Sequence, residues 1–346
     1  MLKTTGTLAI GISLALGMMA SPANAEESIT FSSWGGSFQE AERKAFLDPA
    51  EKALGITIKE DTLNGLADLR AQVQSGSPQW DIAELGSNSC AQAVAEGIVE
   101  PLDYSVINTD GIDKAVIGEN WIGIIYYATV LGWNTDTYGS NPPKDWADFF
   151  NTDKFPGTRS MYAKPYYNLE AALLADGVAP KDLYPLDVER AFALMEKIKP
   201  HVSVWWKSGA QSAQLVKDGE VDMLNVWNGR IGNAMKDGAK GDYTFNGALL
   251  DYDCLVIPKG SKNVALAMKA INEFMKPENQ AELPFHIDYG PVNAKAFDVP
   301  NMITPEMAKK LPSAPENASR SVIFSATYWV GRMNELQERF DLFIQE

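Results

Sequence analysis

The sequence predicts an α/β fold built as two lobes that are joined by two crossing hinge strands. From residue 27 onward, short apolar segments alternate with amphipathic helices, a pattern typical of a mainly parallel sheet covered by helices. The chain has 346 residues, more than one hydrophobic core usually serves. Segments 123–133 and 253–258 stand where the chain would pass from one lobe to the other and return, so we expect a ligand cleft between the lobes.

Residues 1–25 are predicted to be an export signal. Lys3 gives a positive start, residues 8–19 are apolar but short for a membrane helix, and Ala23-Asn24-Ala25 fits a cleavage site. No later apolar run approaches the roughly 18 to 20 residues that a membrane helix needs. We therefore expect a mature protein that begins near Glu26 and works in the periplasm.

The first lobe is expected to follow the order β-α-β-α-β-α. The turn Trp34-Gly35-Gly36-Ser37 separates the first strand from a helix in which Ala41, Phe46 and Ala50 can face a core. The expected strands cover residues 28–33, 56–60 and 80–84, and the expected helices cover 38–54, 66–75 and a segment that begins near 91.

A polar, proline-containing stretch at residues 134–145 indicates entry into the second lobe. There, strands at 202–206 and 221–226 each run into a helix, and a strand at 253–258 returns to the first lobe. Helices are expected at residues 187–199, 210–218, 228–236 and 264–275. The first lobe is thus predicted to hold residues 26–132 and 254–299, and the second 133–253 and 300–346.

The charge of the chain limits its partners. It carries 30 basic and 45 acidic side chains, and loss of Lys3 with the signal leaves a net charge of about −16. This surface argues against nucleic acid and anionic lipid as partners and favours a cationic or partly cationic small ligand. His201 and His286 lie far apart and in no metal-binding motif, so we expect no metal and no cofactor.

Cys90 and Cys254 are the two cysteines of the chain. In an oxidising compartment they can form a single disulfide. They can equally remain two buried thiols, each packing as a small hydrophobe. The sequence leaves both possibilities open.

The chain lacks the motifs that mark common enzymes. It has no Gly-x-Ser-x-Gly, no Walker loop and no Gly-x-Gly-x-x-Gly after a strand. A binding protein is therefore predicted rather than an enzyme. A secreted α/β hydrolase or lyase is the alternative from another class, and it would need a nucleophile beside a base in the cleft.

Aromatic and polar residues stand at the ends of several expected strands, where open α/β sheets bind ligands. A tryptophan beside Gly, Ser or Asn at such an end is less easily placed in a core, whereas Trp121, Trp133, Trp146 and Trp205 are interpreted as packing residues. Arg230 stands at the start of a helix, where the helix dipole disfavours a cation, so a function would explain its position. The predicted ligand-binding residues are Trp34, Ser37, Ser87, Asn88, Tyr127, Ser208, Trp227, Arg230, Asp253 and Tyr289.

Seven segments, in the same order along the chain, resemble the spermidine- and putrescine-binding proteins of bacterial ABC importers. The resemblance covers essentially the whole mature chain. It implies a type II periplasmic binding fold that closes on a small molecule and then docks to membrane permease subunits, and we expect it to act as a monomer. The segments are Ile29-Thr-Phe-Ser-Ser-Trp34, Asp81-Ile-Ala83, Leu131-Gly-Trp-Asn-Thr-Asp136, Asp218-Gly-Glu-Val-Asp222, Trp227-Asn-Gly229, Asp253-Cys-Leu-Val-Ile-Pro258 and Tyr289-Gly-Pro-Val-Asn293.

The resemblance implies roles for several of these residues. Aromatic residues matching Trp34 and Trp227 sandwich the methylene chain of the ligand, and an acid matching Asp253 binds an amine. Ser208 and the Ser87-Asn88 loop match polar positions of the pocket, and Tyr289 is a further match.

Two departures from that family predict a different ligand. The region that matches an acidic cluster reads Pro165-Tyr-Tyr-Asn168, and Arg230 replaces a residue that is usually small or acidic. A guanidinium repels a diamine but grips a carboxylate, and at ~4 Å and an effective dielectric near 20 this change of sign amounts to a few kcal/mol. We therefore expect an ω-amino acid such as γ-aminobutyrate (GABA), with putrescine or spermidine as the alternative.

Overall fold

The computed structural model describes residues 1–2 and 27–345. The predicted export signal therefore lies, apart from its first two residues, outside the described part of the chain. Within that part, none of the helices combines the length and the apolar character needed to cross a membrane.

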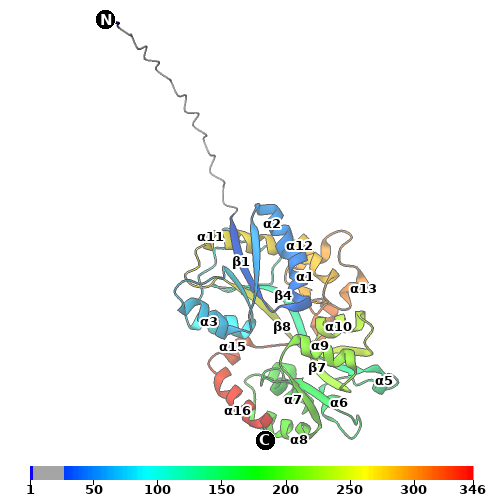
Figure 1. The fold of residues 1–346 in the computed structure, drawn as a ribbon. Coiled ribbons are helices and arrows are strands. Elements are labelled where there is room, and N and C mark those ends of the chain that lie inside the picture. The colour runs from blue at the N-terminus through cyan, green and yellow to red at the C-terminus, as the bar shows by residue number, and fades with distance from the viewer. Residues whose placement is uncertain (3–26, 346) are drawn as a thin grey trace.

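One mixed sheet runs through both halves of the molecule, in the order β2-β1-β3-β8-β4-β7-β5-β6. Strands β4 (Ile122–Asn134) and β8 (Gly241–Val256) lie in its middle, at the junction of the two halves in Figure 1. The two-lobed α/β prediction with two crossing strands is confirmed. The outer strands are β1 (Ser28–Ser33), β2 (Thr57–Thr62), β3 (Ile82–Gly86), β5 (Arg159–Tyr162), β6 (Val202–Trp206) and β7 (Met223–Trp227), and the short strands β9 (Gly290–Pro291) and β10 (Val322–Ile323) pair with β4 and β8.

The expected mainly parallel sheet needs correction, because the crossing strands are antiparallel to their neighbours. β1 pairs in parallel with β2 and β3, and β5 pairs in parallel with β6 and β7. In contrast, β8 is antiparallel to β3 and β4, and β4 is antiparallel to β7. β8 also begins at Gly241, well before the predicted residue 253, because its first half is partly solvated and carries polar residues that hide the strand pattern.

The helices cover the faces of this sheet. The predicted helix 38–54 consists of α1 (Gly36–Glu42), a π-helical turn at Arg43–Leu47 and α2 (Asp48–Leu54). The others are α3 (Leu66–Gln74), α4 (Ser87–Ala95), α5 (Thr135–Tyr138), α6 (Trp146–Phe150), α7 (Asn168–Ala175), α8 (Val188–Ile198), α9 (Gly209–Asp218), α10 (Asn228–Lys236), α11 (Val264–Phe274), α12 (Pro277–Glu282), α13 (Pro305–Ala308), α14 (Pro315–Arg320), α15 (Ala326–Trp329) and α16 (Met333–Gln345).

Apolar side chains pack between sheet and helices in each half. In the first half, the ring of Phe274 on α11 lies 5.9 Å from that of Phe31 on β1 and 6.0 Å from that of Phe46. In the second half, Trp205 on β6 packs edge-on against Phe340 of α16. Burial of each such ring stabilises the fold by roughly 1.5 to 3 kcal/mol. The loops at the strand ends are therefore held by well-packed cores.

Cys90 and Cys254 form a disulfide, which answers the question that the sequence left open. Cys90 lies on α4 and Cys254 on β8, next to Asp253. The bond therefore ties the helix that follows β3 to the crossing strand at the place where the two candidate polar residues Asn88 and Asp253 emerge.

Candidate functional site

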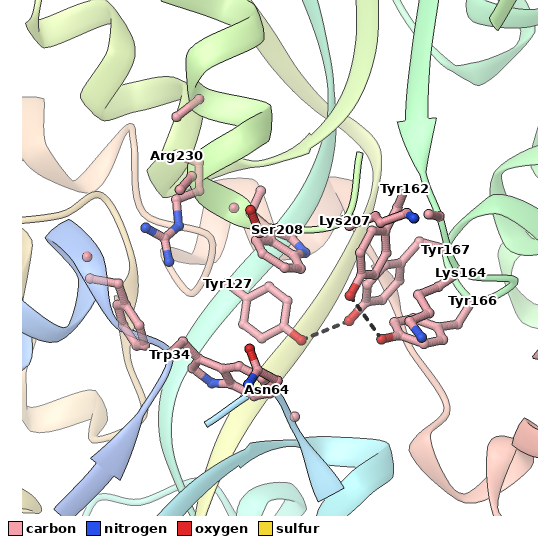
Figure 2. Close-up of a pocket in the computed structure, with 18 of the residues that line it drawn as sticks. Trp34, Asn64, Tyr127, Tyr162, Lys164, Tyr166, Tyr167, Lys207, Ser208 and Arg230 are labelled. Carbon is pink, nitrogen blue, oxygen red and sulfur yellow. Dashed lines mark hydrogen bonds between the residues drawn. The ribbon is translucent and has the colours of Figure 1, made fainter. Parts of the chain in front are cut away.

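A cavity of about 1050 Å³ lies at the strand ends between the two halves. Figure 2 shows its side chains, with Trp34 and Arg230 on one side and Tyr162, Tyr166 and Tyr167 on the other. The structure brings nine of the ten predicted residues together on its lining. They are Trp34, Ser37, Asn88, Tyr127, Ser208, Trp227, Arg230, Asp253 and Tyr289.

Arg230 is a buried cation with no anionic partner among residues 27–345. It is the third residue of α10, directly after β7, and only 7 % of it is exposed. Its guanidinium carbon lies 5.8 Å from the ring centre of Phe38, and its Nε is buried without a hydrogen-bond partner. A buried charge without compensation is costly, so the site favours binding of an anion.

Gly209 makes room for this guanidinium. A Cβ at Gly209 would lie 2.5 Å from Nε of Arg230 and 3.0 Å from the Trp227 ring, so a larger residue there would displace both side chains. Gly209 begins α9, which Ser208 caps by accepting a hydrogen bond from the Gln211 amide at 3.2 Å. The start of a helix also favours negative charge. Arg230 and the first turn of α9 therefore form one anion-binding corner.

Asp253 supplies the opposite charge. It lies on β8 with 7 % of its surface exposed. Burial, together with the nearby carboxylates of Glu84 and Asp251, raises the pKa of Asp253 well above its usual value, while the Trp34 indole and Arg230 act in the other direction. A cationic ligand group beside Asp253 would stabilise its carboxylate form.

Three oxygen atoms from different elements, one of them from Asp253, converge around Gly86. The Cβ that Gly86 lacks would lie 3.5 Å from Asn88 Oδ1, 3.8 Å from Asp253 Oδ1 and 3.9 Å from the Tyr127 hydroxyl. All three can accept hydrogen bonds, and an ammonium group has three donors to offer. We call the three oxygens around Gly86 the oxygen triad.

Aromatic rings connect the anion-binding corner to the oxygen triad. The ring centre of Tyr127 lies 6.1 Å from that of Trp227 and 6.1 Å from that of Tyr289. Trp34 and Trp227 are half-buried on the lining, so part of each ring faces the cavity. Such faces can cover methylene groups and attract a cation.

Ser87 does not lie on the cavity lining. It is 1 % exposed, and its hydroxyl is buried behind the wall, near the carboxylate of Asp251, without a hydrogen-bond partner among the described residues. That carboxylate accepts hydrogen bonds from the hydroxyls of Tyr167 at 2.8 Å and Tyr127 at 3.2 Å, yet burial still raises the pKa of Asp251 to about 6. As the first residue of α4, Ser87 turns toward the interior, whereas its neighbour Asn88 faces the ligand space.

Sequence reasoning missed part of the lining. The segment matched to an acidic cluster contributes a wall of tyrosines, and Trp205, interpreted as packing, also reaches the cavity. Tyr162 ends β5 beside Trp206 at the end of β6, so the strand-end rule could have identified it. The missed residues include Asn64, Tyr162, Lys164, Tyr166, Tyr167, Trp205 and Lys207.

The charged residues of this lining are suited to binding a ligand that carries both a positive and a negative group. Among the described residues that form it there is neither a histidine nor a cysteine. Across residues 1–2 and 27–345, no group of three or more His, Cys, Asp and Glu side chains is arranged to hold a metal ion. The arrangement can hold an anion at Arg230 and a cation at Asp253 with aromatic cover between them.

Comparison with known proteins agrees with the resemblance seen in the sequence. Residues 45–316 match the family described as bacterial extracellular solute-binding protein. The γ-aminobutyric acid-binding protein of Pseudomonas aeruginosa is 33 % identical over 322 residues, which are 91 % of this chain and 90 % of that protein. The spermidine/putrescine-binding periplasmic protein of Escherichia coli is 24 % identical over 314 residues, 88 % of this chain and 87 % of that protein.

Solved structures share the whole fold. An ABC transporter substrate-binding protein from Bradyrhizobium japonicum is 44 % identical with a TM-score of 0.88, covering 92 % of this chain and 100 % of that one. A periplasmic binding protein from A. tumefaciens B6, in complex with glucopine, is 39 % identical with a TM-score of 0.87 and coverages of 92 % and 99 %. A GABA receptor is 36 % identical with a TM-score of 0.83 and coverages of 91 % and 97 %.

Proposed function

This chain belongs to the bacterial extracellular solute-binding proteins, and from that premise we propose that it is the receptor for GABA or a closely similar ω-amino acid. It collects the ligand in the periplasm and presents it, as a monomer and without catalysing a reaction, to the permease subunits of an ABC importer. The lobes that close on the ligand are residues 26–132 with 254–299, and residues 133–253 with 300–346.

The observation that carries this proposal is the buried, unpartnered Arg230 in the same cavity as Asp253. An ω-amino acid bears its carboxylate and its ammonium at opposite ends. The carboxylate would bind Arg230 beside the start of α9, and the ammonium would bind the oxygen triad, with Trp34 and Trp227 against the methylene groups. An α-amino acid carries both charges on one carbon and matches this separation less well.

The alternative ligands are putrescine and spermidine, which the Escherichia coli relative is named for. A diamine would place an ammonium near a guanidinium that has no carboxylate beside it, and two like charges in a dry cleft repel each other. The GABA-binding relative is also more similar, at 33 % against 24 % identity. Both facts support the ω-amino acid.

Isothermal titration calorimetry tests the proposal with one substitution and a matched control. We expect wild-type protein to bind GABA more tightly than putrescine. Arg230→Ala removes one partner of a buried charge pair, which typically costs about 2–5 kcal/mol, so GABA affinity should fall roughly 30-fold or more. Arg332→Ala, at an exposed arginine far along the chain, should bind GABA like the wild type.

Two results would overturn the assignment. One is an Arg230→Ala variant that binds GABA as well as wild type does. The other is wild-type binding of putrescine that is tighter than that of GABA. Asp253→Asn provides a second check, because it should weaken GABA while leaving the affinity for butyrate, which lacks the amine, nearly unchanged.

A further inference from the structure

The cavity lining is positive in a protein that is otherwise strongly negative. The chain carries a net charge of −15. On the lining, however, the described ionisable side chains of Lys, Arg, Asp and Glu are four cations and two acids, namely Lys164, Lys207, Lys217, Arg230, Asp253 and Asp341. A cleft of one sign attracts ligands of the other sign, so this lining favours a guest with more acidic than basic groups.

With the proposed ligand bound, two of these four cations remain without an acidic partner among the described residues. Lys217 bonds to Asp237 at 2.5 Å, whereas Asp341 accepts a hydrogen bond at 2.7 Å from Gln337, which is neutral, and keeps its negative charge. In the proposed function, Arg230 and Asp253 hold the two poles of the ω-amino acid. Lys164 and Lys207 have no acid within 4 Å in the described part of the chain, although both reach the cavity.

The fold places these two lysines at the same edge of the sheet. They follow the neighbouring parallel strands β5 and β6, in which Tyr162 pairs with Trp206. The Ala163 amide continues that pairing with a 2.8 Å hydrogen bond to the Trp206 carbonyl. Figure 2 shows both lysines on the side of the tyrosines, away from Trp34 and Arg230.

The cavity also offers more room than GABA needs. Its volume of about 1050 Å³ is slightly above the range for pockets that hold drug-sized molecules, roughly 300–1000 Å³. GABA has a single unbranched chain of a few heavy atoms. Such a ligand between Arg230 and Asp253 would leave the part of the cavity near Lys164 and Lys207 to water.

The free space begins at the amine end of the ligand. The Tyr127 hydroxyl belongs to the oxygen triad and also lies 2.8 Å from the Tyr167 hydroxyl, so the triad borders the tyrosine wall directly. The carboxylate end is enclosed by Phe38 and Gly209, which contact Arg230. A substituent can therefore leave the ligand from its nitrogen but hardly from its carboxylate.

We propose that the preferred guest is an ω-amino acid whose nitrogen carries an arm ending in a second acidic group, bound between Lys164 and Lys207. This inference rests on the proposed function and deepens it. A secondary ammonium keeps its charge and two N–H donors, which still serve Asp253 and one further oxygen of the triad. The arm passes Tyr127 along the tyrosine wall and brings its carboxylate to the two lysines.

Calorimetry with three matched ligands tests the proposal. They are GABA, N-(2-carboxyethyl)-4-aminobutanoate, and N-propyl-4-aminobutanoate, whose arm has a similar length without charge. We expect the diacid to bind roughly five- to tenfold more tightly than GABA, as two partly exposed ion pairs allow, and the propyl compound to show no such gain. In a Lys164→Gln/Lys207→Gln double variant the gain should vanish while GABA affinity is unchanged.

Lys217→Gln is the matched control, because Lys217 reaches the same cavity but is paired with Asp237. It should retain the full advantage of the diacid. The proposal is overturned if the diacid binds no better than GABA to a protein that binds GABA through Arg230. It is also overturned if the double variant keeps the advantage. Absence of binding by all three ligands would instead reject the proposed function, and this inference with it.

Discussion

At the scale of single residues, Gly86 leaves open the spot where the ligand ammonium should lie. A methyl group there would meet the three triad oxygens at 3.5–3.9 Å, which is ordinary van der Waals contact, and the backbone of Gly86 is extended with φ −65°. Gly86→Ala should therefore fold with wild-type stability but fill the ammonium position. We expect a loss of GABA affinity of at least tenfold, measured by calorimetry beside a thermal melt.

Gly209→Ala is the contrasting variant. Its Cβ would lie 2.5 Å from Arg230 Nε, so it should weaken GABA by displacing the guanidinium rather than by filling the amine position. The two variants are distinguished by butyrate, which uses the carboxylate position alone: Gly86→Ala should leave its binding nearly unchanged and Gly209→Ala should reduce it. Equal GABA affinity for Gly86→Ala and wild type would place the ammonium elsewhere.

A second residue-scale prediction concerns the buried acids beneath the site. The Ser33 hydroxyl lies 2.5 Å from a carboxyl oxygen of Glu42 and 2.6 Å from one of Glu84, and both glutamates are fully buried. One hydroxyl has one proton to donate, so one of the two carboxyls must keep its own proton. In agreement, burial raises the pKa of Glu42 to about 7 and that of Glu84 well above its usual value.

The native state therefore holds protons that the unfolded chain releases above a pKa of 4.5. Stability from this group is fully present below pH 4.5 and is lost as the pH rises through about 7. We expect the free energy of unfolding, measured with urea, to fall between pH 5 and pH 8 by on the order of 1 kcal/mol or more. Glu42→Gln should make this dependence shallower, because Asp251 and Glu170 still contribute, whereas the exposed Glu338→Gln should leave it unchanged. A flat wild-type profile would contradict the protonated pair.

How far the sequence predicts the site depends on what each residue's position reveals. Arg230 could be selected because a cation at a helix start conflicts with the helix dipole, and the structure places it on the cavity lining. Ser87 and Asn88 are adjacent in the sequence, and only the fold at the start of α4 distinguishes the buried Ser87 from Asn88 on the cavity lining. Nothing in the local sequence around Lys164 and Lys207 conflicts with a solvent-exposed position. The sequence therefore does not distinguish them from ordinary surface lysines.

At the scale of elements, local patterns predicted those strands and helices whose boundaries coincide with a change of pattern. β6 and α10 lie where expected. The apolar run of β6 ends just before a helix begins, and α10 begins directly where the apolar run of β7 ends. The first half of β8 was missed, since its stability comes from pairing with β4, far away in the sequence, rather than from its own residues. Long-range pairing of this kind is also why the sheet is mixed.

The disulfide gives a prediction at the same scale. It closes a loop across 164 residues and joins α4 to β8, where Asn88 and Asp253 emerge. Its removal should lower the free energy of unfolding by about 2–4 kcal/mol, the typical contribution of a disulfide. Urea denaturation of wild type with reductant and of a Cys90→Ala/Cys254→Ala double variant should give coincident, shifted curves. Unchanged midpoints on reduction would show that the paired strands β3 and β8 suffice without the bond.

At the scale of the whole molecule, the proposed ligand contacts lie on both sides of the crossing strands. Trp34 follows β1 in one half, Arg230 lies on α10 after β7 in the other, and Tyr127 and Asp253 belong to β4 and β8 between them. A ligand favours the closed arrangement only through contacts that the open one lacks. In the proposed binding mode GABA satisfies this condition, because it would engage Arg230 and the oxygen triad together.

Half-ligands separate closure from mere occupancy of the cleft. Butyrate can bind Arg230 and butylamine can bind Asp253, but neither forms both charged contacts. Each half-ligand therefore stabilises the closed form through one charged contact alone. In small-angle X-ray scattering we expect the radius of gyration to fall with saturating GABA and to stay near the unliganded value with either half-ligand. Arg230→Ala should remain more expanded than wild type even at GABA concentrations that saturate it, since it loses the charged contact from the second half and keeps only the packing of Trp227 there. Compaction by butyrate equal to that by GABA would mean that the guanidinium contact alone closes the cleft, and the role assigned to Asp253 in closure would have to be abandoned.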